Sequence, residues 1–193
     1  MIFVNGTLLL KVGEETSSRI ATVNQHFIIR QEQPEDIQAI TKVIKEAFAN
    51  KPYSKQKEHL IVDELRKTQK LFLSMVAVQE NKVVGYVAFS PALINGYFNG
   101  WYGLGPIAVL PTFQHQGIGG ALIRAGLIEM KYRKTRGVVL IDPLNYRNYY
   151  RLLGFRLLEH SFASKIRGAV LVAPFIQPIT IGKVAYDKAF FIK

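Results

Sequence analysis

Cysteine is absent from the 193-residue chain. Disulfide bonds, zinc sites built on thiolates and a covalent relay of an acyl group through a protein sulfur are therefore excluded. The four histidines lie far apart in the sequence and form no H-x-x-x-H or H-E-x-x-H pair; they are His26, His59, His115 and His160. We therefore predict no metal site.

Acidic residues are also few, with 14 Asp and Glu against 25 Lys and Arg, so that the formal charge is +11. Such a charge suits nucleic acid, an anionic membrane surface or a small polyanionic ligand, and it also suits a solvated basic surface without a partner. The basic residues are scattered, apart from a small cluster at Lys131, Arg133, Lys134 and Arg136. We therefore do not expect nucleic acid as the partner.

Formal charge is missing altogether from residues 83–123, which have the hydropathy of a membrane span. Glycine, proline and asparagine interrupt this stretch too often for a helix of about 20 apolar residues, so we expect buried strands and no membrane. Residues 1–10 are apolar but lack a basic region and a cleavage site. No signal peptide is predicted, and a cytoplasmic location follows.

Length and composition indicate one domain, because chains usually divide only beyond roughly 250 residues. Residues 1–26 show no clear amphipathic period, and we take them as an N-terminal extension of unknown role. Residues 27–193 then form the domain. The hydrophobic pattern predicts an α/β protein with a mixed sheet, in the order β-α-α-β-β-β-α-β-α-β. Strands are expected at residues 27–30, 71–78, 83–89, 101–109, 138–141, 170–172 and 182–191, and a turn at residues 80–82.

Four helices are expected between these strands. The first begins at Pro34, and the second follows Ser54 as its N-cap. Residues 117–132 have the i, i+3, i+4, i+7 apolar spacing of a buried helix face, and residues 145–153 form a last helix that ends at Gly154.

Three glycines, Gly117, Gly119 and Gly120, follow a predicted strand and open a predicted helix. The first N–H groups of a helix have no internal partner, and glycine allows an anion to approach the backbone, so this segment suits a diphosphate. A Rossmann fingerprint does not fit because position 122 is Leu122, and a Walker A motif does not fit because Gly-Lys-Ser/Thr is missing. Close packing of the helix would also account for the glycines.

These residues resemble the phosphate loop of the GNAT superfamily of N-acetyltransferases, Q/R-x-x-G-x-G/A, which Gln114-x-x-Gly117-x-Gly119 matches. The lead-in at residues 104–114, with its Leu-Gly-Pro, and the Y-x-x-x-G-F at residues 150–155 are also similar to that family, and to its bacterial YhbS-like branch. The resemblance covers roughly residues 27–191. It implies the GNAT fold, a mixed, mostly antiparallel sheet flanked by helices, and acetyl-CoA as the cosubstrate.

The resemblance also implies where acetyl-CoA binds. In the family, the strand before the phosphate loop has a bulge and splays from its neighbour, which leaves N–H groups for the thioester carbonyl and the pantetheine. The residues expected to bind the cosubstrate are Ile107, Ala108 and Val109 on this strand, then Gln114, Gln116, Gly117, Ile118, Gly119 and Gly120 in the loop, and Arg124 one helical turn on. An exposed helix arginine is an equal interpretation of Arg124.

Two catalytic roles follow from the resemblance. The Val109 N–H is expected to stabilise the tetrahedral oxyanion, and Tyr150 to protonate the departing thiolate, with Tyr149 as the alternative acid. An aromatic stripe in the core is the other interpretation of these tyrosines. An asparagine that the family often has seven residues before the tyrosine is replaced here by Pro143, with Asn145 and Asn148 nearby.

A general base is harder to assign, because no Asp or Glu occurs between Glu80 and Glu129. We expect water, or a carboxylate of the helical region such as Glu58, Asp63 or Glu64. The chain is thus predicted to be an N-acetyltransferase that acts on the primary amine of a small molecule or peptide by direct attack in a ternary complex. A non-catalytic acyl-CoA sensor and a basic nucleic-acid-binding protein are the alternatives, and a homodimer is compatible with the sequence.

Overall fold

A computed structural model describes residues 2–4, 7–9, 27–142, 146–179 and 182–191. Within these residues the centre of the molecule is one sheet of eleven strands, in the order β2-β1-β3-β4-β5-β6-β7-β10-β8, with β11 beside β5 and β9 beside β11. The strands are β1 (Ile2–Val4), β2 (Thr7–Leu9), β3 (Ile28–Gln31), β4 (Leu73–Gln79), β5 (Lys82–Ile94), β6 (Tyr97–Val109), β7 (Gly137–Asp142), β8 (Arg156–Leu157), β9 (Phe162–Ala163), β10 (Ala169–Pro174) and β11 (Lys183–Ala185). Only the β6–β7 and β9–β11 pairs of this described sheet are parallel.

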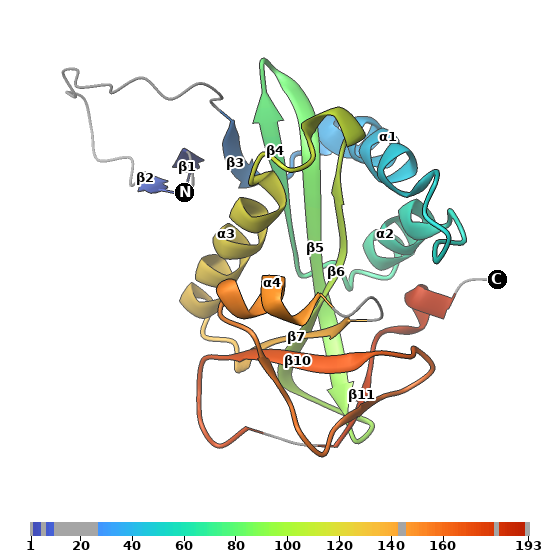
Figure 1. Ribbon diagram of the computed structural model, residues 1–193, viewed down its shortest axis with the longest axis vertical. Helices are drawn as coiled ribbons and strands as arrows, with labels where there is room; N and C mark the ends of the chain where they lie inside the picture. Colours follow the sequence, from blue (N-terminus) through green and yellow to red (C-terminus); the bar gives the residue numbers. More distant parts are fainter. Residues whose placement is uncertain (1, 5–6, 10–26, 143–145, 180–181, 192–193) are drawn as a thin grey trace.

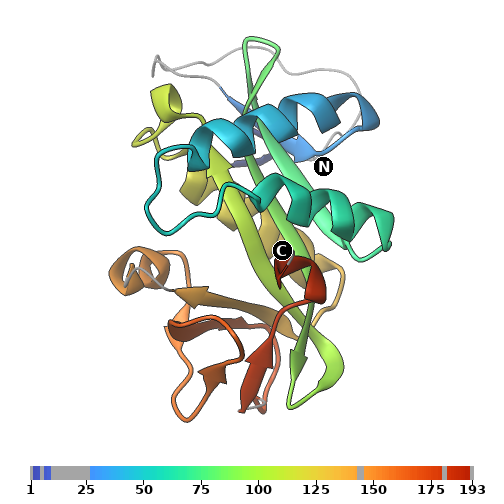
Figure 2. The same cartoon turned by 90° about the vertical axis from the view of Figure 1, so that its right-hand side faces the viewer.

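Helices cover both faces of the sheet, as Figure 1 shows: α3 lies on one side of β4 and β5, and α1 and α2 lie on the other. Figure 2, turned by 90°, shows α1 and α2 in front of the strands. In the same view α4, β7 and β10 lie in the lower part of the molecule, away from α1. The helices are α1 (Ile37–Phe48), α2 (Glu58–Lys67), α3 (Ile118–Tyr132) and α4 (Arg147–Leu152), and the 3-10 turns are η1 (Pro34–Asp36), η2 (Pro111–Phe113) and η3 (Lys188–Phe191). No helix in the described ranges is long and apolar enough to cross a membrane.

Strand β4 shows how one run of residues serves both faces. Met75 and Ala77 belong to the core cluster beneath α3, whereas Val76 between them packs in the cluster beneath α1. This alternation follows from the two-residue period of a strand. Because both faces are covered, the central strands are buried on both sides over much of their length and carry no charge apart from the exposed Lys82 that begins β5. This burial accounts for the part of the uncharged stretch, residues 83–123, that belongs to β5 and β6.

Glycines bring α3 close to the sheet. A Cβ on Gly126 would lie 2.3 Å from Cζ of the fully buried Phe89, and one on Gly85 would lie 3.0 Å from the side chains of Ile118 and Leu122. No side chain larger than hydrogen fits at Gly126 without a shift of its neighbours. The close approach fixes α3 against the strands, so that its N-terminus has a defined position beside β6.

The second helix begins later than the sequence predicted. Ser54 does not cap it; the Ser54 Oγ donates a hydrogen bond to Glu58 Oε1 (2.7 Å) and accepts one from the Gln56 N–H (2.8 Å). Gln56 has a φ of 58°, a left-handed conformation that interrupts a helix, and α2 therefore begins at Glu58. The segment before Ile37 also differs, because it is a 3-10 turn and not the first turn of α1.

Two strands are longer than predicted. β5 and β6 continue to a two-residue turn at Asn95-Gly96, where both residues have positive φ (54° and 87°). Asn-Gly is a strong hairpin signal, and the prediction overlooked it. The turn expected at residues 80–82 is confirmed in position but shorter, since Lys82 already belongs to β5.

The C-terminal segment is not one strand over residues 182–191. β11 ends at Ala185, and η3 follows because Asp187 Oδ1 accepts a hydrogen bond from the Ala189 N–H (2.9 Å), as an Asx turn does. Elsewhere, Gly154 ends the α4 segment with a φ of 90°, as predicted, whereas Asn145 and Pro143 lie outside the described residues. Of the extension at residues 1–26, β1 and β2 form a hairpin, and β1 pairs with β3 at the edge of the sheet.

Candidate active site

A bulge bends β6 just before the glycine loop. Val87 pairs with Ile107 and Phe89 pairs with Leu104, so that β6 contains one residue more than β5 over the same length. The extra residue falls at Gly105-Pro106, where Gly105 has a φ of 147°. A bulge changes the direction of the strand that carries it, and here it turns the end of β6 away from its other neighbour.

That neighbour is β7, which pairs with β6 over only three residues. The pairing joins residues 101–103 to residues 137–139, although β6 continues to Val109 and β7 to Asp142. The two strands therefore diverge, and the inner edge of β6 beyond the bulge has no strand partner among the described residues. The resemblance had implied such a splayed strand.

The direction of the backbone in β6 decides which N–H groups face this opening. The Leu110 N–H donates to the Val84 carbonyl oxygen (2.9 Å). Because hydrogen-bonded pairs alternate along an antiparallel ladder, the Ala108 amide also faces β5, whereas the amides of Ile107 and Val109 face the opening. Consistently, the Val109 carbonyl oxygen accepts a hydrogen bond from Gln114 Nε2 (2.9 Å) on that side.

The glycine loop places the start of α3 at the same opening. Gly117 is the N-cap with a φ of 80°, and the first intrahelical bond runs from the Ala121 N–H to its carbonyl oxygen (3.0 Å). The preceding amides of Ile118, Gly119 and Gly120 have no partner within the helix. A Cβ on Gly119 would lie 3.4 Å from the Tyr149 hydroxyl and 3.8 Å from Val109 Cγ2, so the glycine leaves open the space between β6 and α4.

Two adjoining cavities occupy the opening. The first, of about 430 Å³, lies along the inner edge of β6, and we call it the acyl cavity. The second, of about 630 Å³, lies at the glycine loop and is lined by Gly117, Gly119, Gly120 and Arg124; we call it the loop cavity. Val109, Gln114, Tyr146 and Tyr149 line both cavities, so a long ligand can extend from one into the other.

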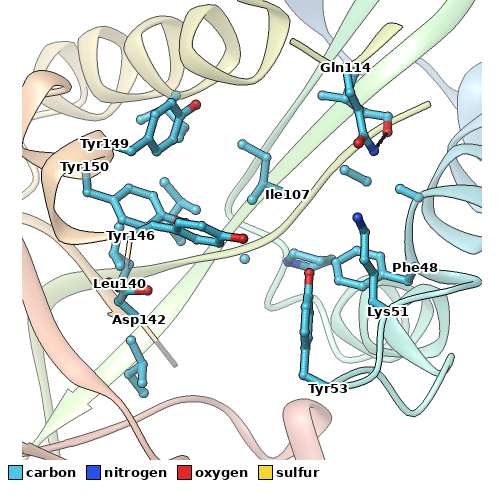
Figure 3. A pocket seen from close by; sticks show the side chains of 18 residues that line it. Phe48, Lys51, Tyr53, Ile107, Gln114, Leu140, Asp142, Tyr146, Tyr149 and Tyr150 are labelled. Carbon is cyan, nitrogen blue, oxygen red and sulfur yellow. Dashed lines mark hydrogen bonds between the residues drawn. The ribbon is translucent and has the colours of Figure 1, made fainter. Parts of the chain in front are cut away.

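Figure 3 shows how the acyl cavity is built. Tyr149 and Tyr150 of α4 lie on one side with Asp142, and Phe48, Lys51 and Tyr53 of the α1–α2 segment lie on the other. Between them runs β6, represented by Ile107, with Gln114 at one end. The cavity therefore brings together segments that are far apart in the sequence.

The two candidate acids differ in their surroundings. Tyr150 is half-buried, lines only the acyl cavity and packs against the main core, with its ring 5.9 Å from that of Phe155. Tyr149 is more exposed, and its hydroxyl lies near Gly119. Burial raises the pKa of Tyr150, and the negative charge of Asp142 raises it further; burial also raises the pKa of Tyr149, against the opposing effect of Arg124. Both phenols are therefore protonated at neutral pH.

Asp142 is a carboxylate that the sequence analysis missed. It ends β7, it lines the acyl cavity, and its side chain is nearly buried (4% exposed). The signal that could have found it is an acidic residue directly after a buried strand, at the end where the two parallel strands diverge. The three carboxylates suggested instead do not line this cavity: Glu58 accepts a hydrogen bond from Ser54, Asp63 pairs with Arg66 (3.1 Å), and Glu64 lies on α2.

The remaining predicted residues lie around the loop. Arg124 is exposed and lines the loop cavity, where its guanidinium is 3.5 Å from the position of a Cβ on Gly120. The Gln116 side chain bonds to the Thr112 carbonyl oxygen (3.1 Å) and lines neither cavity, so a contact from this residue would come from its backbone. No group of three or more His, Cys, Asp or Glu that could hold a metal occurs among the described residues.

Comparison with known proteins identifies the family. The Acetyltransferase (GNAT) domain family matches residues 70–157. The uncharacterized N-acetyltransferase YhbS of Escherichia coli is 33% identical over 136 residues, which cover 69% of this chain and 76% of YhbS. The chain belongs to the GNAT acetyltransferase family.

Solved structures of GNAT proteins agree with this assignment. A GNAT acetyltransferase from Brucella melitensis, crystallised with acetyl-CoA, is 43% identical with a TM-score of 0.74, over 86% of this chain and 98% of that one. YhbS from Escherichia coli, crystallised with CoA, is 25% identical with a TM-score of 0.78, over 90% of this chain and 97% of that one. The mixed sheet flanked by helices is thus the GNAT fold, and the chain is an acyltransferase by family.

Proposed function

We propose that this chain transfers an acetyl group from acetyl-CoA to the primary amine of an acceptor, by direct attack within a ternary complex. The observation that carries the proposal is the opening between β6 and β7. It combines strand amides without partners in the sheet, a glycine-rich helix start and a buried carboxylate. The Brucella melitensis relative, whose structure contains acetyl-CoA, supports the same donor here.

The donor would lie along the two cavities. Its pyrophosphate binds the amides at the start of α3 in the loop cavity, where the helix dipole and Arg124 favour negative charge. Its pantetheine follows the inner edge of β6 past Ile107, and the thioester reaches the acyl cavity. The Val109 N–H is the oxyanion donor in this proposal, a contact typically worth about 3 kcal/mol in the transition state.

Three proton transfers accompany the acyl transfer. The incoming ammonium must first lose a proton, and Asp142 is the proposed acceptor of that proton, because it is the carboxylate that lines the acyl cavity. The amine then attacks the thioester carbon, the oxyanion collapses, the C–S bond breaks, and Tyr150 donates its proton to the leaving thiolate. The second proton of the former ammonium passes from the nitrogen to the Tyr150 phenolate, which leaves a neutral amide and restores the phenol. The raised pKa of Tyr150 suits this role, since the phenol is protonated before the thiolate forms.

Binding of the donor is the first test. Acetyl-CoA at 100 times its Kd stabilises the folded chain by about 2.7 kcal/mol. For a chain of this size that corresponds to a rise in Tm of roughly 5–11 °C. An unchanged Tm at millimolar acetyl-CoA would contradict the proposal.

Transfer is the second test, followed as release of free CoA with a thiol reagent over a panel of amines. The chain has no cysteine, so every thiol detected in this assay comes from the product. Asp142→Asn should lower kcat, while the Kd for acetyl-CoA stays unchanged. Donor binding without release of CoA for any amine would favour the sensor function over catalysis.

A further inference from the structure

A third cavity, of about 560 Å³, lies between the loop that leads into α2 and the loop that precedes β10. Four cationic side chains line it: Lys55 and Lys57 from the first loop, Lys165 and Arg167 from the second. Glu58 is the single carboxylate among the described residues of its lining. We call it the basic cavity. Its volume is within the range of cavities that hold small ligands.

The four cations form no ion pair with any carboxylate of the described residues. Ion pairs occupy only some of the basic side chains in the described part of the chain, and the following bond to an Asp or Glu within 3.0 Å: Arg30, Arg66, Lys70 and Arg133. The four cations of the basic cavity are distinguished by lining one concave surface together. The Nζ of Lys165 lies over the ring of Phe191, 5.2 Å from the ring centroid, in a cation–π contact. Cations that line a concave surface without counterions create a positive potential that attracts an anion.

The basic cavity adjoins the acyl cavity and not the loop cavity. Tyr53 lines both the basic cavity and the acyl cavity, and Figure 3 shows its side chain directed into the latter. The loop cavity and the basic cavity share no lining residue. A donor that fills the loop cavity therefore leaves the basic cavity open to the second substrate.

We propose that the basic cavity binds an anionic group of the acceptor, a phosphate or a carboxylate, while the amine of the same molecule reaches Asp142 in the acyl cavity. This inference rests on the proposed function and specifies its acceptor class. Lys51, which lines the acyl cavity, adds to the positive charge on the acceptor side. Polyamines and other polycationic acceptors are disfavoured, because they would bring further positive charge into this region.

A binding experiment tests the cavity without requiring turnover. The chain is saturated with CoA to occupy the donor site, and inorganic phosphate is titrated while Tm is followed. Phosphate should raise Tm of the parent chain and leave Tm of Lys165→Gln/Arg167→Gln unchanged. The matched control, Lys131→Gln/Lys134→Gln, removes the same charge at the end of α3 and should respond like the parent. Equal responses of all three proteins, or no response of the parent, would overturn the proposal.

Kinetics with paired acceptors test the substrate class and separate the two anions. Phosphoethanolamine is compared with ethanolamine, and β-alanine with propylamine, in the CoA-release assay. The anionic member of at least one pair should have a kcat/KM at least about tenfold higher, as expected for one hydrogen bond to a charged group. Lys165→Gln/Arg167→Gln should remove this advantage through KM and leave the Kd for acetyl-CoA unchanged. Equal use of neutral and anionic amines would refute the acceptor class, whereas failure of acetyl-CoA to bind would refute the proposed function itself.

Discussion

The methyl group added by Gly119→Ala tests whether the start of α3 binds the pyrophosphate. Gly119 has no positive φ, and its Cβ would lie 3.4 Å from the Tyr149 hydroxyl, 3.8 Å from Val109 and 3.9 Å from Ile107. These are ordinary van der Waals distances, so the apo protein accommodates the methyl group. The same methyl group would occupy the space through which a phosphate oxygen approaches the amides.

The expected loss of affinity for acetyl-CoA follows from the hydrogen bonds that a displaced phosphate loses. A hydrogen bond to a charged group contributes about 1.5–3 kcal/mol, so loss of one such bond raises the Kd for acetyl-CoA roughly 10- to 150-fold. Stability should remain or increase, since alanine is better than glycine in a helix by up to about 1 kcal/mol. The substitution thus separates ligand binding from folding.

Isothermal titration of acetyl-CoA and thermal unfolding of the free protein measure the two quantities. Gly96→Ala is the matched control: no atom lies within 4 Å of its Cβ position, but its φ of 87° makes a side chain unfavourable by about 1–2 kcal/mol. The control should therefore lose stability and keep its affinity, the reverse of Gly119→Ala. If Gly119→Ala binds acetyl-CoA as tightly as the parent chain, the pyrophosphate does not bind where we place it.

Three further predictions concern the acid, the packing of α3 and an ion pair. Tyr150→Phe should lower kcat by about 10²- to 10⁴-fold without changing the Kd for acetyl-CoA, and Tyr149→Phe should have the smaller effect; the reverse order in the CoA-release assay would make Tyr149 the acid. Gly126→Ala should lower the free energy of unfolding by about 1–2 kcal/mol in urea denaturation, because Phe89 must move. The bidentate hydrogen bonds from Arg30 (2.6 and 2.8 Å) lower the pKa of Asp36, so its contribution to stability is present above the ordinary Asp pKa of 3.8 and is lost as pH falls below it. Asp36→Asn should be less stable at pH 7, and its stability should fall less between pH 5 and 2; parallel pH curves would contradict this.

The proposed donor side leaves a signal in the sequence because it depends on the backbone. Gly117 and Gly119 leave a recognisable pattern in the sequence. Gly117 is an N-cap in the left-handed conformation, which favours glycine, and Gly119 has no side chain to block the approach to the amides. The bulge at Gly105-Pro106 is likewise marked by its residues. Ala108, in contrast, was grouped with Ile107 and Val109 although its amide faces β5, because only the register of the ladder decides which amides are turned outward.

The side chains of the proposed acceptor side could not be brought together from the sequence, because they come from distant segments. Asp142, Tyr53 and Lys51 meet in one cavity although they come from β7 and the α1–α2 loop, and no spacing in the sequence records their proximity. The sequence-based prediction found no acid on the strand before the glycine loop and considered water or the helical carboxylates Glu58, Asp63 and Glu64. It overlooked the end of the neighbouring strand, which faces the same opening once β6 and β7 diverge.

The proposed donor and acceptor ends of the site would therefore bind negative charge through different groups, backbone amides at the first and cationic side chains at the second. At the proposed donor end, amides of α3 and β6 would bind the ligand, so we expect a substitution that blocks the backbone, such as Gly119→Ala, to lower the affinity. At the acceptor end, Lys55, Lys57, Lys165 and Arg167 lie on two loops and no ion pair within the described residues holds them. Their charges can be replaced without disturbing the sheet or the start of α3. Acceptor preference in this chain should thus be alterable by substitutions that leave acetyl-CoA binding unchanged.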